Sequence, residues 1–367
     1  MNIGIDIRSA LKKTNTGIGR YTLNLINALS KPGSRRESDF DSNNYYLYSK
    51  KRFFDFKRRL PILPGKNFKH VKILPELDIF HTSSYDLERP KNAKKFIITV
   101  HDVIIKAYPY GHDEATIKQV DVQLKRALSE ADLLIADSHN TKSDIIKFYQ
   151  IPDSKIQVIY PGVAERSSSI PLPPRRWPKA SCGVEAYILF VGTIEPRKNV
   201  QGLIKAFNLL KKEIVEDRHA CPLRLYIVGM KGWMYEDIFK EYENSEFKND
   251  IIFKGYVNDK KLAELYKNAL VFVYPSFYEG FGFPILEAFG YGVPVVTSKT
   301  SSCGEIAGDS ALLINPESYK EIGEAISKII NDEALRQGLI KKGFERIKDF
   351  TWDRTAREFL RLLRNDV

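Results

Sequence analysis

The chain has 367 residues, 43% of them hydrophobic, which is enough for two domains with separate cores. No apolar run is long enough to span a membrane, and residues 1–8 follow a strand pattern, not that of a signal peptide. The three scattered cysteines, Cys182, Cys221 and Cys303, argue against a disulfide framework or a metal site. They favour reduced thiols, and so we expect a cytoplasmic protein.

The net charge of +11 indicates an anionic partner, and the strongest basic cluster lies within residues 50–72. Phenylalanines alternate there with lysines and arginines, as in segments that bind an anionic membrane surface or a phosphorylated acceptor. A solvated basic face whose phenylalanines point into the core explains this segment equally well. The sequence shows no pattern of a nucleic-acid-binding module, so nucleic acid is not an expected partner.

The first residues predict a strand, a glycine turn and a helix, as at the start of a nucleotide-binding domain. The strand is expected at residues 2–8 and the flexible turn at 14–19, and apolar residues at helical spacing follow. A turn that simply requires glycine is enough to explain Gly17 and Gly19.

Residues 39–94 predict only short strands and loops, whereas the apolar run at 95–100 predicts a buried strand that ends at His101-Asp102. Ligands of open α/β sheets bind beyond the carboxyl ends of the strands, so His101 lies where chemistry is expected. A histidine that caps a loop is the alternative. The remaining elements of this half are a helix at 113–130, a strand at 133–136, a helix at 141–149 with Ser138 as a candidate N-cap, and a strand at 156–160.

A segment rich in serine and proline without periodic pattern predicts a linker at residues 166–180, between domains at 1–165 and 181–350. Beyond it, continuous apolar strands alternate with helices, which is typical of a doubly wound parallel sheet. The strands are expected at 187–193, 223–228, 251–256 and 270–274, and the last helices at 319–332, 333–349 and 352–363. The final helix, within residues 351–367, is expected to bury one face against one of the two domains, and the pattern alone does not distinguish the first from the second.

Residues 274–296 read as a strand end, a glycine-rich turn, a helix and the next strand. If the helix opens near Phe283, free main-chain amides at Gly282 and beyond form an anion site at its positive end. Glu279 and Glu287 flank this site with seven residues between them, and carboxylates beside an anion are favourable where they accept hydrogen bonds from hydroxyls. A sugar nucleotide combines both features. An ordinary βαβ turn with two solvated acids is the alternative.

This stretch resembles the glutamate–seven–glutamate motif of retaining glycosyltransferases with the GT-B fold, specifically the large family 4. The resemblance extends to IGIDIR and TGIGRYTLNL near the amino terminus, to His101-Asp102-Val103 and to VGTIEPRKN at residues 191–199. GIGRY and HDV together are most similar to bacterial mannosyltransferases. The resemblance implies two Rossmann-like doubly wound domains that face a cleft, with the C-terminal helix crossing back to the first domain.

Arg197 and Lys198 follow a strand end, where adjacent cations can straddle a diphosphate, although a basic helix start paired with Glu195 explains them as well. The resemblance favours the diphosphate. It also implies that His101 contacts the transferred sugar and that Glu279 positions this sugar, so the expected catalytic residues are His101, Arg197, Lys198 and Glu279. The expected substrate-binding residues are Gly17, Gly19, Ser138, Gly229, Tyr256, Val257, Phe281, Gly282, Phe283 and Glu287.

The sequence lacks the paired aspartates of metal-dependent transferases, so we expect no metal and no cofactor beyond the nucleotide-sugar donor. The predicted activity is retaining transfer of a hexose, mannose from GDP-mannose, to a saccharide or lipid-linked saccharide in the synthesis of cell-surface polysaccharide such as lipopolysaccharide. A donor such as UDP-glucose or UDP-N-acetylglucosamine is the nearest alternative. The others are a sugar-nucleotide 2-epimerase of the same fold and a non-catalytic basic scaffold at a membrane. For the enzyme itself, the basic cluster is consistent with a peripheral position at the inner face of the plasma membrane.

Overall fold

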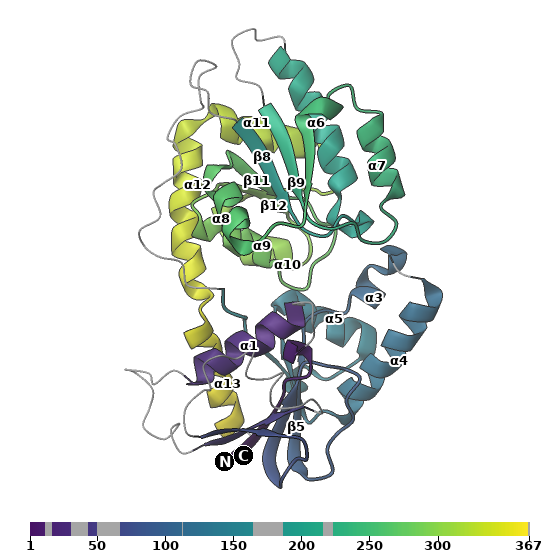
Figure 1. Cartoon of the computed structure of the whole chain (residues 1–367), viewed down its shortest axis with the longest axis vertical. Helices are drawn as coiled ribbons and strands as arrows, with labels where there is room; N and C mark the ends of the chain where they lie inside the picture. The colour runs from purple at the N-terminus through teal and green to yellow at the C-terminus, as the bar shows by residue number, and fades with distance from the viewer. Residues whose placement is uncertain are drawn as a thin grey trace. The chain divides into compact units, whose positions relative to one another are not determined.

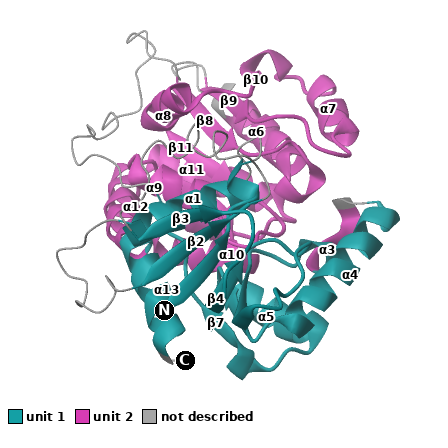
Figure 2. Cartoon of the chain, turned by 60° about the horizontal axis from the view of Figure 1, so that its bottom comes forward, with its two compact units in different colours: residues 1–106, 113–164, 350–367 teal, residues 107–112, 165–349 magenta. Residues whose placement is uncertain are grey.

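The computed structural model describes residues 1–11, 17–30, 43–49, 67–111, 113–163, 186–215 and 223–365. Most of the basic cluster, the predicted linker, and Cys182 and Cys221 lie outside the described residues. Figure 2 shows the two compact units of the chain: unit 1 comprises residues 1–106, 113–164 and 350–367, and unit 2 comprises 107–112 and 165–349. No helix in the described ranges is both long and apolar enough to cross a membrane.

The described residues of unit 1 form a seven-stranded parallel sheet in the order β3-β2-β1-β4-β5-β6-β7. Figure 1 labels its strand β5. The helices of unit 1 lie on both faces of the sheet, and the short helix α3 (Ile104–Ala107) follows β5. The strands are β1 (Asn2–Asp6), β2 (Asn44–Tyr48), β3 (Phe68–Val71), β4 (Leu77–Thr82), β5 (Ala93–Val100), β6 (Leu133–Ala136) and β7 (Ile156–Val158), and the longer helices are α1 (Gly17–Ser30), α4 (Glu114–Glu130), α5 (His139–Tyr149) and α13 (Trp352–Asn365).

The alternation of side chains along β5 explains why this sheet needs helices on both faces. Ile97 belongs to the core formed with α1 and α13, whereas its neighbours Phe96 and Ile98 belong to the core formed with α4 and α5. All three side chains are at most 1% exposed. A strand that is apolar on both sides stays out of water only between two layers of helices. The predicted doubly wound arrangement is confirmed.

The helix α1 begins at Gly17, so Gly17 and Gly19 lie in its first turn, and the prediction of a flexible turn that reaches Gly19 was wrong. Glycine weakens a helix by roughly 1 kcal/mol per position. Burial of Tyr21, Leu25 and their neighbours against the sheet outweighs this cost. A side chain at position 17 would contact no atom within 4 Å, so packing does not require glycine there.

The described residues of unit 2 form a six-stranded parallel sheet in the order β10-β9-β8-β11-β12-β13. Its central strands are buried along nearly their whole length, which again indicates cover on both faces. The strands are β8 (Ala186–Val191), β9 (Leu223–Val228), β10 (Ile251–Gly255), β11 (Val271–Tyr274), β12 (Val295–Ser298) and β13 (Leu312–Ile314). The helices are α6 (Val200–Val215), α7 (Glu236–Glu243), α8 (Asp259–Asn268), α9 (Phe283–Gly290), α10 (Ser301–Ala307), α11 (Tyr319–Asn331) and α12 (Glu333–Arg346).

The last helix, α13, leaves unit 2 and completes unit 1, where it packs against α1. The apolar face predicted for this helix lies in the core that α1 shares with the sheet, and its members are at most 1% exposed: Ala356, Phe359, Leu360 and Leu363. The expected crossing of the terminal helix to the first domain is therefore confirmed, and the alternative that it caps the second domain is wrong.

We expect Gly162→Ala to destabilise unit 1, because the new Cβ would lie 2.2 Å from the main-chain nitrogen of Trp352. The hydrogen bond from Val163 N to Phe350 O, at 3.0 Å, holds this main chain in place. Overpacking of this kind costs about 1–3 kcal/mol and should lower the midpoint of thermal unfolding. Gly338→Ala in α12 is the control, since its Cβ would meet no atom within 4 Å. Equal midpoints for the two variants would contradict the close approach.

Candidate active site

Arg197 and Lys198 lie in a single 3-10 turn between β8 and α6, at the carboxyl edge of the sheet in unit 2. Asn199 ends this turn in the left-handed conformation, with φ 55°, and its Oδ1 accepts from Gly202 N in the first turn of α6. Its Nδ2 donates to Pro275 O at 3.2 Å, just beyond the end of β11. One asparagine therefore fixes the two cations beside the neighbouring strand end.

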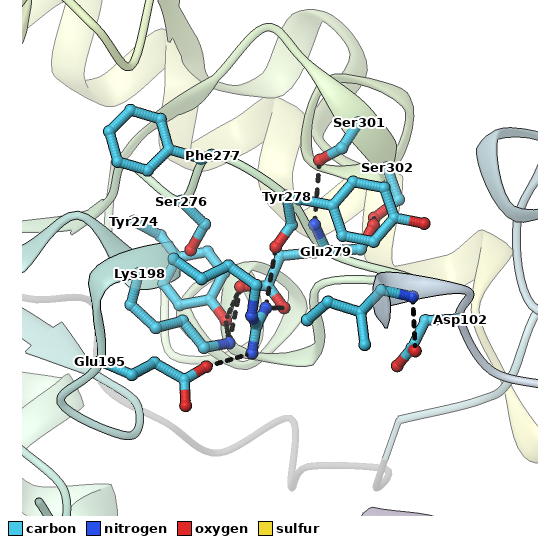
Figure 3. Close-up of polar contacts among 12 residues, drawn as sticks. Asp102, Glu195, Lys198, Tyr274, Ser276, Phe277, Tyr278, Glu279, Ser301 and Ser302 are labelled. Atoms are coloured by element: carbon cyan, nitrogen blue, oxygen red, sulfur yellow. Dashed lines mark hydrogen bonds and ion pairs between the residues drawn. The ribbon is translucent and has the colours of Figure 1, made fainter. Parts of the chain in front are cut away.

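The carboxylate of Glu279 bridges the two cations (Figure 3). Its Oε1 lies 2.6 Å from Lys198 Nζ, and its Oε2 lies 2.8 Å from Arg197 Nη1. The hydroxyl of Tyr274, the last residue of β11, donates to Oε1 at 2.9 Å and accepts from Lys198 Nζ at 2.6 Å. Glu195 forms a second ion pair with Arg197. Two cations and two carboxylates thus form one network, which we call the charge cluster.

The charge cluster is almost completely removed from water, since Glu279 and Lys198 are each 8% exposed. Burial alone would raise the pKa of Glu279, but Lys198 and Arg197 outweigh it and lower this pKa to about 2. Burial also lowers the pKa of Lys198, against the opposing effect of Glu279. The guanidinium of Arg197 is only partly buried, and Glu279 and Glu195 outweigh the effect of this burial and raise its pKa. The carboxylate of Glu279 is therefore charged at neutral pH.

The turn that carries Glu279 is held by its main chain, so the position of the carboxylate is fixed. Glu279 N donates to Ser301 Oγ at 3.2 Å, and Ser302 Oγ donates to Glu279 O at 2.8 Å, both at the start of α10 (Figure 3). Arg197 Nη1 donates to Tyr278 O at 2.8 Å. Main chain and side chain therefore tie the turn to both the cations and α10.

The helix α9 begins at Phe283, as predicted, directly after Gly282. Gly282 has φ 116°, a conformation that residues with a side chain rarely adopt, so the turn into α9 requires glycine. Phe281 is 4% exposed, and its ring packs against that of Phe283 at 4.9 Å between centroids, so Phe281 is a core residue. Glu287 is half-buried, and its Oε2 accepts from the hydroxyl of Tyr266 at 3.0 Å.

Close packing of two strand ends requires glycine at position 229, directly after β9. A Cβ at Gly229 would lie 1.8 Å from the carbonyl oxygen of Gly192, so the two loops meet main chain to main chain. Tyr256 follows β10 and is 72% exposed, and Val257 is half-buried. Both lie beyond the carboxyl end of their strand, the edge at which ligands of parallel sheets bind.

In unit 1, His101 follows β5 and its Nδ1 lies 2.6 Å from Oδ2 of Asp137, which follows β6. The ring of Tyr21 packs edge-on against the imidazole, with 4.8 Å between centroids. Asp102 orders the loop that follows β5, since its Oδ1 accepts from Ile104 N at 3.1 Å. Ser138 Oγ accepts from Thr141 N, so the N-cap interpretation of this serine is confirmed.

Sequence reasoning missed two residues of these sites, Tyr274 and Asp137. Both are signalled by position, since each stands at the carboxyl end of a buried strand next to one that carries an expected site residue. It also did not predict that Arg197 and Lys198 pair with Glu279 itself. The described residues contain no group of three or more His, Cys, Asp and Glu side chains arranged to hold a metal ion.

Comparison with known proteins identifies the family. Residues 15–166 match the family "Glycosyltransferase Family 4", and residues 176–346 match "Glycosyl transferases group 1". The O-antigen chain mannosyltransferase B of Escherichia coli is 31% identical, over 94% of this chain and 94% of its own length. The chain belongs to glycosyltransferase family 4.

Other comparisons agree with a family 4 glycosyltransferase. The O-antigen chain mannosyltransferase RfbU of Salmonella typhimurium is 30% identical, over 63% of this chain and 60% of its own length. Among solved structures, sucrose-phosphate synthase from Thermosynechococcus elongatus superimposes with a TM-score of 0.72 at 18% identity, over 99% of this chain and 98% of that one. At this identity the likeness concerns the fold alone, which is GT-B.

Proposed function

We propose that this glycosyltransferase transfers mannose from GDP-mannose, with retention at the anomeric carbon, to a saccharide or lipid-linked saccharide in the synthesis of a cell-surface polysaccharide. The observation that carries the proposal is the charge cluster, in which the buried Lys198 and Glu279 and the partly buried Arg197 are held together before the amino terminus of α9. The two mannosyltransferase relatives support mannose as the sugar. We expect the transfer to take place in the cytoplasm.

The proposed chemistry places negative charge on the leaving nucleoside diphosphate. As the bond between the anomeric carbon and the β-phosphate oxygen breaks, Arg197 and Lys198 would stabilise the charge that develops on the phosphate. An acceptor hydroxyl forms the new bond on the same face of the sugar, and its proton passes to the departing phosphate. Glu279 would position a hydroxyl of the sugar and stabilise the positive charge on the ring.

The remaining expected residues take supporting roles in this proposal. Glu287 would accept from the ribose hydroxyls, since it lies in the second turn of α9 with its carboxylate directed by Tyr266. The exposed ring of Tyr256 and the adjoining Val257 would border the base, and Gly229 the diphosphate. His101 would contact a hydroxyl of the transferred sugar.

The decisive experiment is a panel of nucleotide sugars, assayed for release of the nucleoside diphosphate by the purified full chain. We expect slow release of GDP from GDP-mannose without an acceptor and faster release with one. Release of UDP from UDP-glucose or UDP-N-acetylglucosamine instead would show that the proposed donor is wrong, whereas the proposed glycosyl transfer would stand. Interconversion of the sugar without release of nucleotide would indicate an epimerase, and no turnover of any donor would indicate a scaffold.

We expect the transferase activity to be unchanged by EDTA, because side chains and helix amides would supply the positive charge that a metal supplies in other transferases. The assay compares initial rates of GDP release with and without millimolar EDTA, and after added Mg²⁺ or Mn²⁺. Complete loss of activity with EDTA that Mg²⁺ or Mn²⁺ restores would contradict the proposed metal-free mechanism.

A further inference from the structure

We propose that Asp137 is a positioning residue for His101. Asp137 holds Nδ1 of the imidazole and thereby directs Nε2 to a hydroxyl of the sugar substrate. The pairing of the two side chains rests on the geometry of unit 1 alone. The assignment of a sugar hydroxyl as the group that meets Nε2 rests in addition on the proposed function.

Sheet topology brings the two residues together. The strands β5 and β6 are parallel neighbours, and their last residues, Val100 and Ala136, are paired in register. His101 and Asp137 are the next residues of each strand, so both leave the sheet at the same edge. The resulting contact of 2.6 Å between Nδ1 and Oδ2 is short even for a charge-assisted hydrogen bond.

The surroundings hold this pair in one arrangement. Asp137 is 1% exposed, and the ring of Tyr21, which is 2% exposed, packs edge-on against the imidazole. The main chain of His101 is held as well, since its nitrogen donates to the hydroxyl of Tyr85 at 3.3 Å and its carbonyl oxygen accepts from Thr141 Oγ1 at 3.4 Å. The imidazole therefore cannot turn away from Asp137 without disturbing several buried contacts.

The partner of Nδ1 decides what Nε2 can do. A carboxylate only accepts hydrogen bonds, so Nδ1 of His101 must carry a proton. In the neutral ring Nε2 is then an acceptor, and in the charged ring it is a donor. Nε2 is buried and has no hydrogen-bond partner among the described residues. An unpaired buried polar atom is costly, and a substrate hydroxyl, which donates and accepts, would pair with it in either state.

The same contact raises the pKa of His101. Burial lowers this pKa, but the charge and hydrogen bond of Asp137 and the charge of Asp102 outweigh it. His81 lies on the neighbouring strand β4, and burial lowers its pKa to about 3, so it stays neutral while His101 titrates. Among the described residues, the ionisable groups around His101 are Tyr21 from α1, His81 from β4, Tyr85 from the loop after β4, Asp102 from its own loop and Asp137 from the end of β6.

The first test is a pair of variants that each remove one negative charge near the imidazole, Asp137→Asn and Asp102→Asn. Among the described residues, Asp137 alone hydrogen-bonds the ring, so we expect Asp137→Asn to lower kcat/KM by about 10- to 100-fold, as for a lost bond to a charged group. The pH dependence of kcat/KM also reports the contact between Asp137 and the imidazole, since loss of Asp137 lowers the pKa of His101. Any limb of the profile that His101 controls should shift to lower pH, and shift less in Asp102→Asn. Equal losses and equal shifts in the two variants would overturn the proposal.

A double mutant separates positioning from a structural role. If Asp137 acts through His101, then Asp137→Asn should cost little further activity in a His101→Ala background. A loss of the same factor in both backgrounds would mean that Asp137 supports the fold and not the imidazole, and this would overturn the proposal. Thermal unfolding of each variant shows whether it remains folded.

A measurement without substrate tests the pairing directly. The chain has six histidines, so ¹⁵N-histidine labelling gives few signals, and the His101→Ala spectrum identifies that of His101. We expect protonated Nδ1 and unprotonated Nε2 when His101 is neutral, and the reverse tautomer would overturn the proposal. This result holds even if Asp137→Asn fails to fold. If no nucleotide sugar is turned over while Nδ1 is protonated, the proposed function fails and the pairing stands.

Discussion

Lys198→Ala should reduce the rate of hexose transfer by about 100-fold or more, the usual cost of removing a preorganised group that stabilises charge in a transition state. Lys198 is a strong candidate because its ammonium is buried and fixed, with Nζ held by Glu279 and Tyr274 at 2.6 Å each. A cation that is already desolvated and oriented does not reorganise when the phosphate leaves. The measurement is kcat for GDP release in the presence of acceptor.

The matched control for this variant is Lys205→Ala, which removes a lysine from α6 a few residues further along the chain. Lys205 is 41% exposed in its side chain and pairs with Glu241 at 3.6 Å, and such surface pairs contribute little. We expect its rate to stay within about twofold of the wild type. Arg197→Ala should behave as Lys198→Ala does. Full activity of both variants of the charge cluster would show that it does not bind the diphosphate.

Glu279→Gln should bind GDP more tightly than the wild type while its rate of transfer falls by about 100-fold. The carboxylate of Glu279 now pairs with both Arg197 and Lys198, so it competes with an incoming diphosphate for the same two cations. Glutamine keeps the shape and removes the charge, which should lower the Kd of GDP by about tenfold, or 1.4 kcal/mol. Transfer falls because the group that positions the sugar is weakened. Isothermal titration and single-turnover rates measure the two effects separately.

Glu287→Gln is the control for the binding measurement. It makes the same change in the second turn of α9, and we expect it to weaken GDP binding because Glu287 would lose a hydrogen bond to the ribose. If both variants weaken binding equally, Glu279 does not compete with the diphosphate.

Glu279→Gln should also unfold at lower temperature, since breaking a buried ion pair costs about 3–5 kcal/mol. In the wild type, the lowered pKa means that the stabilisation by Glu279 is complete above about pH 4.5 and is lost as the pH falls toward about 2.

The sequence predicted best those elements whose pattern reflects burial. The strand before His101, the helix that begins at Phe283 and the apolar face of the last helix were all found where expected. The secondary structure of residues 39–94 was poorly predicted, because the strands described there do not follow a simple pattern of apolar and buried residues. In β3 no residue is fully buried, and in β4 the polar His81 and Thr82 are buried in hydrogen bonds that no apolar pattern reveals.

The candidate site was predictable as a set of positions and not as a set of contacts. Strand ends and glycine turns indicated Arg197, Lys198 and Glu279, because parallel sheets gather such ends at one edge. Which acid pairs with which base depends on strand order, and order is set by packing between segments far apart in the sequence. The partnership of His101 with Asp137 is an example: β5 and β6 are neighbours, but a helix of 17 residues separates them in the chain.

The return of α13 to unit 1 has a consequence for biosynthesis. The hydrophobic core of the first unit combines residues from the first strand with Phe359 and Leu363 near the carboxyl end. A nascent chain on the ribosome thus exposes the apolar side of unit 1 until α13 has been synthesised, whereas the sheet of unit 2 can already form. Unit 1 begins first but is completed only after unit 2, and a premature stop codon shortly before α13 would leave the core of unit 1 incomplete.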